Sequence, residues 1–96
     1  MAVQISTWDA AEHLDTDEAI AAYLSEVMAL DDPQHLVQAL NTIARAHGMT
    51  QIARNAGIGR QALYKSLGET GNPTLTTLMS VMKALGLKLN AVAAKS

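Results

Sequence analysis

The stretch that most restricts the fold lies at residues 49–67, MTQIARNAGIGRQALYKSL, which reads as two short helices joined by a tight turn. We expect Thr50 to cap the first helix, because its hydroxyl can accept a backbone N–H that the opening turn leaves unpaired. Gly57 follows where a reversing chain needs a residue that tolerates positive φ. Ile58 would then fill the angle between the helices, and Gly59 would open the second helix.

The second of these helices separates apolar from polar side chains. Leu63 and Leu67 share one side of the helix, and four polar side chains occupy the other. Arg pairs with guanine through two hydrogen bonds, Gln pairs with adenine in the same way, and Lys contacts guanine or phosphate. The outer face therefore predicts contacts to DNA bases and phosphates, made by Arg60, Gln61, Tyr64 and Lys65.

This arrangement resembles the helix-turn-helix of the Xre/Cro repressor family. The matching positions are Ile52, Ala53, Gly57, Ile58 and Leu63. The resemblance implies that the second helix lies in the major groove of DNA, where its first residues read bases. Thr50 and Gln51, at the start of the first helix, are further expected DNA contacts. The chain departs from the family pattern at Gly59 and Ser66. Gln51 also lies slightly later than the Gln with which family members often start the first helix, so the resemblance does not assign individual base contacts.

The charged residues are unevenly distributed along the 96-residue chain. Residues 1–44 contain eight acidic side chains and no Lys or Arg, whereas residues 45–96 contain all seven basic side chains and Glu69. The net charge of −2 therefore hides two segments of opposite sign, which suggests two surfaces with two kinds of partner. The alternative is a chance clustering of solvated charges. The basic segment coincides with the helix-turn-helix, which favours the first interpretation.

Two helices are expected in the acidic segment 15–47. The first spans about residues 16–30 with Asp15 as its cap. The second is capped by Asp32, carries Pro33 in its first turn and ends at Gly48. Their apolar stripes are Ile20, Tyr23, Leu24, Val27 and Met28 in the first helix, and Leu36, Val37, Leu40, Ile43 and Ala44 in the second.

A turn rich in Gly, Asn and Pro leads into the last expected helix, residues 74–85, which Thr74 caps and Gly86 closes. Its apolar stripe is predicted to be Leu75, Leu78, Met79, Met82 and Leu85. In Xre-type domains an Asn-Pro pair before this cap approaches the phosphate backbone, which makes Asn72 an expected DNA contact. The alternative is a purely structural turn.

The two ends of the chain suggest partners. Residues 1–14 form an arm in this interpretation, and its Trp8 either packs on the body of the protein or docks on a partner. Residues 87–93 alternate partly between apolar and polar, which is a weak strand signal. No other stretch reads as β, so such a strand would pair with its copy in a homodimer.

The composition argues against several protein classes. The chain has no Cys, and its three His residues lie in separate segments, so no metal-ligand pattern is present. We expect a single domain over residues 1–96 with no enzymatic activity, no metal and no cofactor. No apolar run approaches the roughly 20 residues of a membrane span, and the N-terminus has no export signal. We therefore expect a cytoplasmic protein that does not contact membranes.

Over residues 8–92 the chain also resembles the addiction-module antidote family. The motifs that carry this resemblance are Trp8-Asp9, Glu12–Asp15, Asp17–Leu24, Asp32-Pro33, Ile43–Arg45, Met49–Gln51, Ala62–Lys65, Gly71–Pro73 and Ala84–Leu87. The resemblance implies an antitoxin of a type II toxin–antitoxin module, similar to the HigA group. Such a protein neutralises a RelE/ParE-like toxin, which is usually small and basic, and represses their shared operon. The acidic residues between 9 and 32 would then orient a basic toxin.

Three functional interpretations follow, all within an all-α, five-helix, Xre/Cro-like fold. The first is an antitoxin that binds both operator DNA and a toxin. The second is a free-standing Xre-type transcriptional regulator whose acidic half only dimerises or meets another protein. The third is an interaction module that has lost DNA binding, which the intact polar face of the second helix argues against. A small basic reading frame next to the gene would favour the first.

Overall fold

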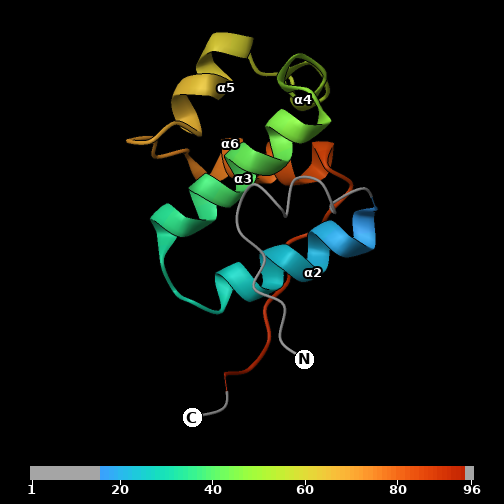
Figure 1. Cartoon of the computed structure of the whole chain (residues 1–96), viewed down its shortest axis with the longest axis vertical. Coiled ribbons are helices and arrows are strands. Elements are labelled where there is room, and N and C mark those ends of the chain that lie inside the picture. Colours follow the sequence, from blue (N-terminus) through green and yellow to red (C-terminus); the bar gives the residue numbers. More distant parts are fainter. Residues whose placement is uncertain (1–15, 95–96) are drawn as a thin grey trace.

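A computed structural model of the chain describes residues 16–94. This part contains five α-helices and no strand, which confirms the all-α prediction (Figure 1). The helices are α2 (Asp17–Met28), α3 (Pro33–His47), α4 (Met49–Ala56), α5 (Arg60–Ser66) and α6 (Leu75–Ala84). The predicted arm at residues 1–14, with Trp8, lies outside the described residues.

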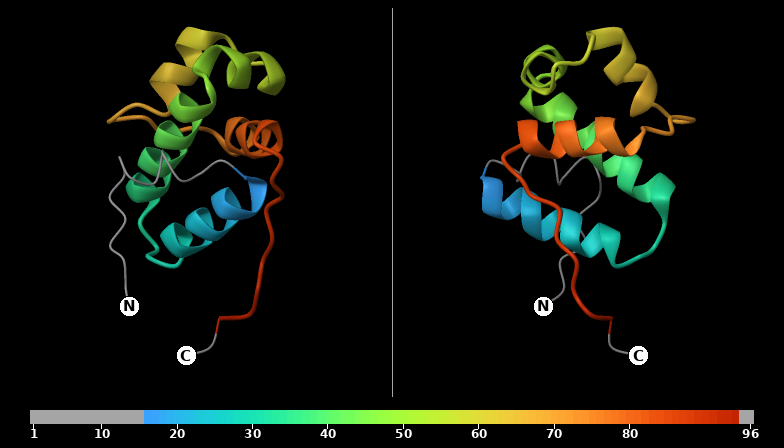
Figure 2. Two further views of the ribbon diagram at one scale, coloured as in Figure 1. Left: turned by 45° about the vertical axis from the view of Figure 1, so that its right-hand side comes forward. Right: turned by 180° about the vertical axis from the view of Figure 1, so that it is seen from behind.

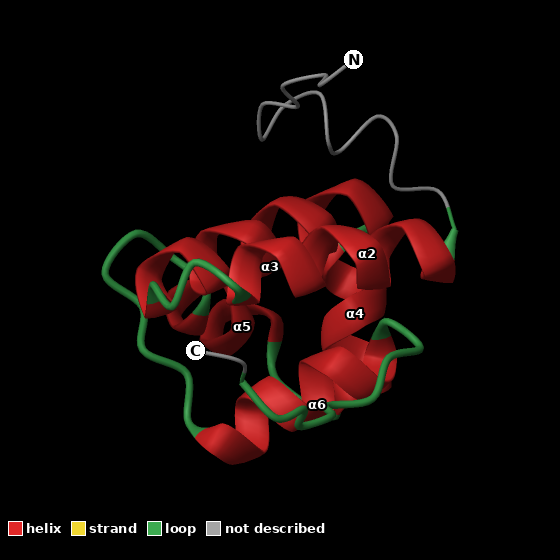
Figure 3. Ribbon diagram, turned by 90° about the horizontal axis from the view of Figure 1, so that it is seen from below, coloured by secondary structure: helices red, strands yellow, loops and turns green. Residues whose placement is uncertain are grey.

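Helix α4 occupies the centre of the arrangement, because it packs against α3, α5 and α6. Helix α2 packs against α3 at the opposite end of the molecule from α5 (Figures 1 and 2). Seen along the long axis, α3 and α6 lie on opposite sides (Figure 3). The order of the helices thus separates α2 from the predicted DNA-reading helix α5.

The helices share a core of aliphatic and methionine side chains, as a chain without Phe requires. Each of α2 to α6 contributes to this core. The largest fully buried side chains are Ile20, Leu24, Leu40, Ile43, Leu63, Leu67 and Val81. Burial of one such side chain stabilises the fold by about 1.5–3 kcal/mol. The predicted stripes of the two helices in the acidic segment are therefore largely confirmed, although Tyr23, Met28 and Leu36 are only partly buried at the edge.

The cap of α2 differs from the prediction. Thr16, rather than Asp15, is the N-cap residue, and its hydroxyl accepts the N–H of Ala19 at 3.0 Å. The Thr hydroxyl stands three residues before this donor, the spacing that an N-cap requires. Asp15 itself lies outside the described residues. The helix also ends at Met28, earlier than predicted, and the following turn contains Asp31 at a φ of 56°.

The start and end of α3 follow the sequence signals. The Asp32 carboxylate accepts the N–H groups of Gln34 and His35 at 3.1 and 3.4 Å, and Pro33 is the first helical residue. Gly48 ends the helix at a φ of 96°, a backbone conformation that favours glycine. Both predictions are confirmed.

The prediction that Thr50 caps the next helix is wrong. Gly48 is both the C-cap of α3 and the N-cap of α4. Its carbonyl accepts the N–H of Ile52 at 3.0 Å. Because one residue serves both helices, α4 begins at Met49, and Thr50 is its exposed second residue. No side chain caps α4.

Helix α6 has the predicted ends but a different buried side. The Thr74 hydroxyl accepts the N–H of Thr77 at 3.1 Å, and Gly86 follows the helix at a φ of 80°. The predicted stripe is wrong at two positions, because Leu75 and Met79 are 67% and 52% exposed. The buried side is instead formed by Leu78, Val81, Met82 and Leu85, at i, i+3, i+4 and i+7.

Residues 87–94 form no strand in this chain. They leave α6 and run across α2 in an extended path (Figure 2, right). Leu87 and Leu89 line a small cavity of about 110 Å³ together with Leu24 and Met28 of α2. The predicted pairing of residues 87–93 needs a second chain, so it stays a prediction.

Candidate nucleic-acid interface

Helices α4 and α5 meet at a tight turn, as the sequence predicted. Gly57 adopts the left-handed conformation at a φ of 71°. The N–H of Ile58 donates to the carbonyl of Ala53 at 2.9 Å, and the N–H of Gly57 donates to that of Arg54 at 3.2 Å, a pattern that closes a helix at a glycine. Ile58 is partly buried against the core. The turn therefore fixes the angle between the two helices.

The orientation of α5 follows from its two buried leucines. Leu63 and Leu67 are 0% and 2% exposed, so the opposite side of this short helix must face solvent. That side presents the four predicted DNA-contacting residues of α5, and all of them are exposed: Arg60, Gln61, Tyr64 and Lys65. Gly59 precedes the helix without any side-chain cap.

Two of these side chains support each other. The guanidinium carbon of Arg60 lies 5.5 Å from the centre of the Tyr64 ring, and a nitrogen of that guanidinium donates to the Tyr64 hydroxyl at 3.5 Å. Arg60 and Tyr64 are four residues apart, a spacing at which helical side chains lie over one another. The contact holds the Arg60 side chain along the outer face of α5.

Helix α4 adds polar groups beside this face. Thr50 and Gln51 are exposed, as a DNA contact requires. The side-chain amide of Gln51 donates to the amide oxygen of Asn55 at 3.0 Å. Asn55 was not among the residues predicted from the sequence, although its spacing of four from Gln51 on one helix was a usable signal. The bond leaves the Gln51 oxygen free to accept a hydrogen bond from a ligand.

The loop between α5 and α6 is held close to the end of α5. Gly71 is buried, and a Cβ there would overlap the backbone of Ser66 and come within 2.8 Å of the Lys65 carbonyl oxygen. Only glycine allows this approach. The next residue, Asn72, is exposed on the loop, so its predicted DNA contact stays a prediction beside the structural alternative.

Asn41 connects α3 to the end of α5. Its side-chain amide donates to the carbonyl of Leu67 at 2.8 Å, and Asn41 is half-buried. Among the side-chain hydrogen bonds within residues 16–94, this is the one that links segments distant in sequence, across 26 residues. This bond was not predicted from the sequence. The available signal was a polar residue four positions after Val37, next to the apolar side of an amphipathic helix.

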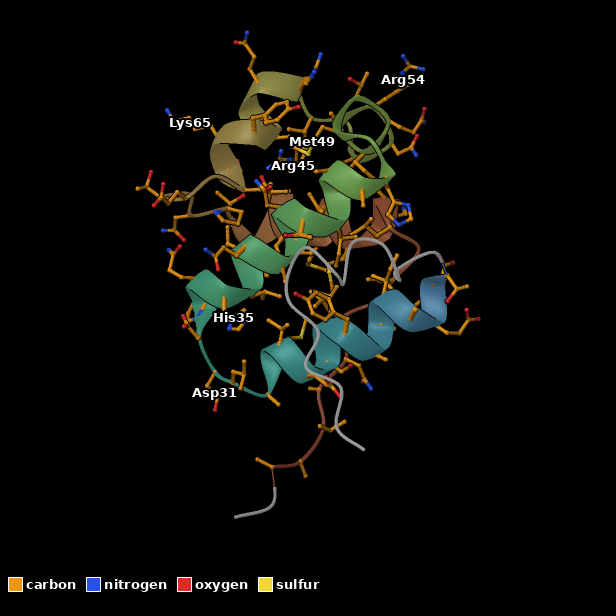
Figure 4. The ribbon with its side chains drawn as sticks, in the orientation of Figure 1. Asp31, His35, Arg45, Met49, Arg54 and Lys65 are labelled. Carbon is orange, nitrogen blue, oxygen red and sulfur yellow. The ribbon has the colours of Figure 1, made fainter. Side chains whose placement is uncertain are left out.

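Acidic side chains predominate at the α2 end of the described part of the molecule and basic ones at the α4–α5 end, although Lys88 lies beside α2 and Glu69 follows α5. Arg54 and Lys65 lie at the end that carries α4 and α5, whereas Asp31 lies at the end that carries α2 (Figure 4). The other acidic residues of α2 and of the turn after it are all exposed: Asp17, Glu18, Glu26 and Asp32. A polyanion is therefore attracted to the α4–α5 end and repelled from the α2 end.

Residues 16–94 contain neither a metal-ligand cluster nor a membrane-spanning helix. No three His, Cys, Asp or Glu side chains of this part lie close enough together to hold a metal ion. His35 and His47 lie near opposite ends of α3. No helix in this range combines the length and the apolar character needed to cross a membrane.

Comparisons with known proteins identify the family. Residues 4–93 match the sequence model of a family described as "Probable addiction module antidote protein". A protein of Haemophilus influenzae, described as uncharacterized, is 51% identical over 88 residues, which cover 92% of this chain and 91% of that protein. No solved structure is significantly similar to the chain. On the match over residues 4–93, the chain belongs to the family of probable addiction module antidote proteins.

Proposed function

We propose that this protein is the antitoxin of a type II toxin–antitoxin module and that it represses its own operon through an Xre/Cro-type, HigA-like helix-turn-helix. The observation that carries the DNA-binding part is the exposed face of α5, with Arg60, Gln61, Tyr64 and Lys65 fixed outward by two buried leucines. In this proposal α5 enters the major groove, while residues at the start of α4 and in the loop before α6 contact phosphates.

The toxin part rests on the family and on charge. An antidote of an addiction module implies a toxin partner of some kind. We propose a RelE/ParE-like toxin, which is small and basic, and we place its contact at the acidic α2 end. Complementary charge speeds and orients such an encounter. Because α2 and α5 lie at opposite ends, the toxin and the operator would use separate surfaces. In this proposal the protein is a cytoplasmic homodimer without catalytic activity of its own.

The alternative is a free-standing Xre-type regulator without a toxin partner, which would share the DNA-binding face. The two functions differ in what the α2 end binds. Purified protein is mixed with the product of a small basic reading frame adjoining its gene, and the mixture is analysed by size-exclusion chromatography at low and high salt. A stable complex that weakens with salt supports the antitoxin. If no such reading frame adjoins the gene, or its product does not bind, the regulator alternative is favoured.

The DNA-binding part is tested by gel-shift titration on the DNA upstream of the gene at two salt concentrations. Arg60→Ala and Gln61→Ala are each expected to cost about 1–3 kcal/mol of specific binding, because each removes a base contact. Lys65→Ala should weaken binding to every sequence and flatten the salt dependence by about one unit of slope. Gln34→Ala is the matched control, since Gln34 is exposed at the start of α3, away from α5.

Unchanged operator binding in all three α5 variants would contradict the assignment of α5 as the recognition helix. If the wild-type protein binds the upstream DNA only after the toxin is added, the toxin is a co-repressor. If it never binds, the protein is an interaction module that retains a helix-turn-helix.

A further inference from the structure

Helix α4 has a polar side as well as a buried one. Its buried residues are Met49, Ile52 and Ala53, which pack into the core. Away from them, three exposed residues lie at i, i+3 and i+4, a spacing that places them on one side of the helix: Gln51, Arg54 and Asn55. We call these three residues the α4 polar face. Arg54 and Asn55 were not among the DNA contacts predicted from the sequence.

Two members of the α4 polar face are joined to each other. The side-chain amide of Gln51 donates to the amide oxygen of Asn55 at 3.0 Å. Within residues 16–94 this is the side-chain hydrogen bond that each of the two makes. Each amide group carries two N–H donors, so all but one of the donors of the pair remain available to a ligand. Phosphate oxygens only accept hydrogen bonds, and they match this surplus of donors.

Arg54 adds a positive charge to the same face. It lies at the α4–α5 end of the molecule (Figure 4). Residues 49–66, which contain both helices, include Arg54, Arg60 and Lys65 and neither Asp nor Glu. No carboxylate of this segment therefore competes for the Arg54 guanidinium. A guanidinium forms strong, charge-assisted hydrogen bonds with phosphate.

A purely structural role of the α4 polar face is the alternative. Arg54 lies in the last turn of α4, where a cation interacts favourably with the helix dipole. A hydrogen-bonded pair four residues apart also stabilises a helix slightly. Position favours DNA, because the first helix of a helix-turn-helix crosses the phosphate backbone while the second lies in the groove. Helix α4 packs against α5, and Arg54 lies at the same end of the molecule as Lys65 (Figure 4).

We infer that the α4 polar face binds the phosphate backbone of DNA beside the groove that α5 enters. Arg54 supplies the charge, and Asn55 holds the amide of Gln51 in place for the phosphate. Asn55 thus acts partly through Gln51, as a positioning residue. The inference rests on the proposed function and deepens it, because it adds Arg54 and Asn55 to the surface that contacts DNA.

The turn between the helices gives this contact a further consequence. Because the backbone hydrogen bonds at Gly57 and Ile58 fix the angle between α4 and α5, the two helices meet DNA as one unit. A phosphate held by α4 therefore also sets where α5 lies in the groove. Phosphate contacts determine register and orientation on the duplex and carry no sequence information themselves. Loss of the α4 contact should weaken binding to every sequence.

Gel-shift titrations at several salt concentrations test Arg54, on the upstream DNA and on an unrelated duplex of equal length. They use the conditions in which the wild-type protein binds the upstream DNA. Arg54→Ala should weaken binding to both duplexes about 10- to 100-fold at low salt, and it should lower the salt slope by about one unit for each bound copy. Arg54→Lys retains the charge and should retain the slope. Lys88→Ala is the matched control, since exposed Lys88 lies beside α2.

The amide pair carries no charge, so its variants should behave differently. Asn55→Ala and Gln51→Ala should each weaken binding to both duplexes about three- to tenfold and leave the salt slope unchanged. Because Asn55 acts partly through Gln51, the loss in the double variant should be smaller than the product of the two single losses. Asn55→Asp keeps an acceptor for Gln51 but places a carboxylate near phosphate, so it should weaken binding more than Asn55→Ala.

Melting temperatures separate these effects from a structural role. All three residues are exposed, so each variant should melt close to the wild type. Binding of Arg54→Ala to both duplexes with wild-type affinity and salt slope would overturn the charge assignment. So would a loss confined to the upstream sequence, because Arg54 would then read a base. A double variant whose loss equals the full product of the single losses would overturn the positioning role of Asn55.

Failure of the proposed function gives a different result. A wild-type protein that binds neither duplex, with or without the neighbouring gene product, refutes the proposed DNA binding and this inference together. Operator binding that Arg60→Ala weakens but that Arg54→Ala and Asn55→Ala leave intact refutes the inference alone.

Discussion

Removing the hydrogen bond between Asn41 and the end of α5 should loosen the proposed DNA-reading helix. The bond is short, at 2.8 Å, and half-buried. Asn41→Ala loses a hydrogen bond worth about 1 kcal/mol and leaves the Leu67 carbonyl without this partner, so we expect a loss of about 1–2 kcal/mol in the free energy of unfolding. For a domain of this size the melting temperature should fall by roughly 5–10 °C.

The effect on DNA should exceed the effect on stability alone. Helix α5 is only seven residues long and has no side-chain cap at its start. With its end released, the outward side chains would lose their alignment with base edges. We expect Asn41→Ala to weaken specific operator binding about tenfold, equivalent to about 1.4 kcal/mol, and to leave binding to unrelated DNA nearly unchanged. The ratio of the two affinities is measured by gel shift at a temperature where the variant is fully folded.

Two more variants make this test sharp. Asn41→Asp keeps the shape of the side chain but places an acceptor against the Leu67 carbonyl, so its effect should equal or exceed that of Asn41→Ala. Thr42→Val is the control, because the Thr42 hydroxyl donates to the Gln38 carbonyl within α3, at 3.1 Å, and does not reach α5. If both Asn41 variants keep the wild-type melting temperature and affinity ratio, the bond does not hold the helix and the reasoning is refuted.

The remaining predictions concern stability and are measured by thermal or urea unfolding. Gly71→Ala should destabilise by more than about 2 kcal/mol, because its Cβ would overlap the backbone at the end of α5, whereas Gly59→Ala meets open space and should be near neutral. A Gly71→Ala protein as stable as wild type would show that this loop can move freely. Leu63→Ala should cost about 2–5 kcal/mol, because Leu63 is fully buried, and the exposed Leu75→Ala should cost little. Equal costs for the two leucines would contradict the core described above.

Much of the fold could be predicted from local signals in the sequence. Apolar periodicity placed α2, α3 and α6, and the glycines of a tight turn placed α4 and α5. Asp32, Thr74 and Gly57 were correctly identified as residues that start or end helices. These signals act within a few residues, so one sequence contains the necessary information. The prediction that Thr50 is the N-cap of α4 was wrong because α3 and α4 share Gly48 as a cap. No local signal in the sequence distinguishes a shared cap from two separate caps.

The errors in the buried face and in the site have a different cause. An apolar residue on α6 can face the core or a partner, and periodicity alone does not decide which, so Leu75 and Met79 were assigned to the wrong side. The contacts of Asn41 and Gly71 depend on where α5 ends relative to α3 and to the loop, which only the tertiary structure reveals. The outward face of α5 was predictable because it is the complement of Leu63 and Leu67 on one short helix.

The single residue between α3 and α4 limits how the length of this chain can change during evolution. One amino acid inserted at Gly48 would divide the shared cap, in which the N–H of Gly48 donates to the Arg45 carbonyl and the carbonyl of Gly48 accepts the N–H of Ile52. Ile52 and Ala53 of α4 would then be displaced from the positions in which they are buried, so we expect insertions and deletions here to destabilise the fold. The exposed turn at residues 29–31 has no such constraint, since its side chains face solvent. Relatives of different length should therefore gain or lose residues in that turn and keep the spacing from α3 to α5 fixed.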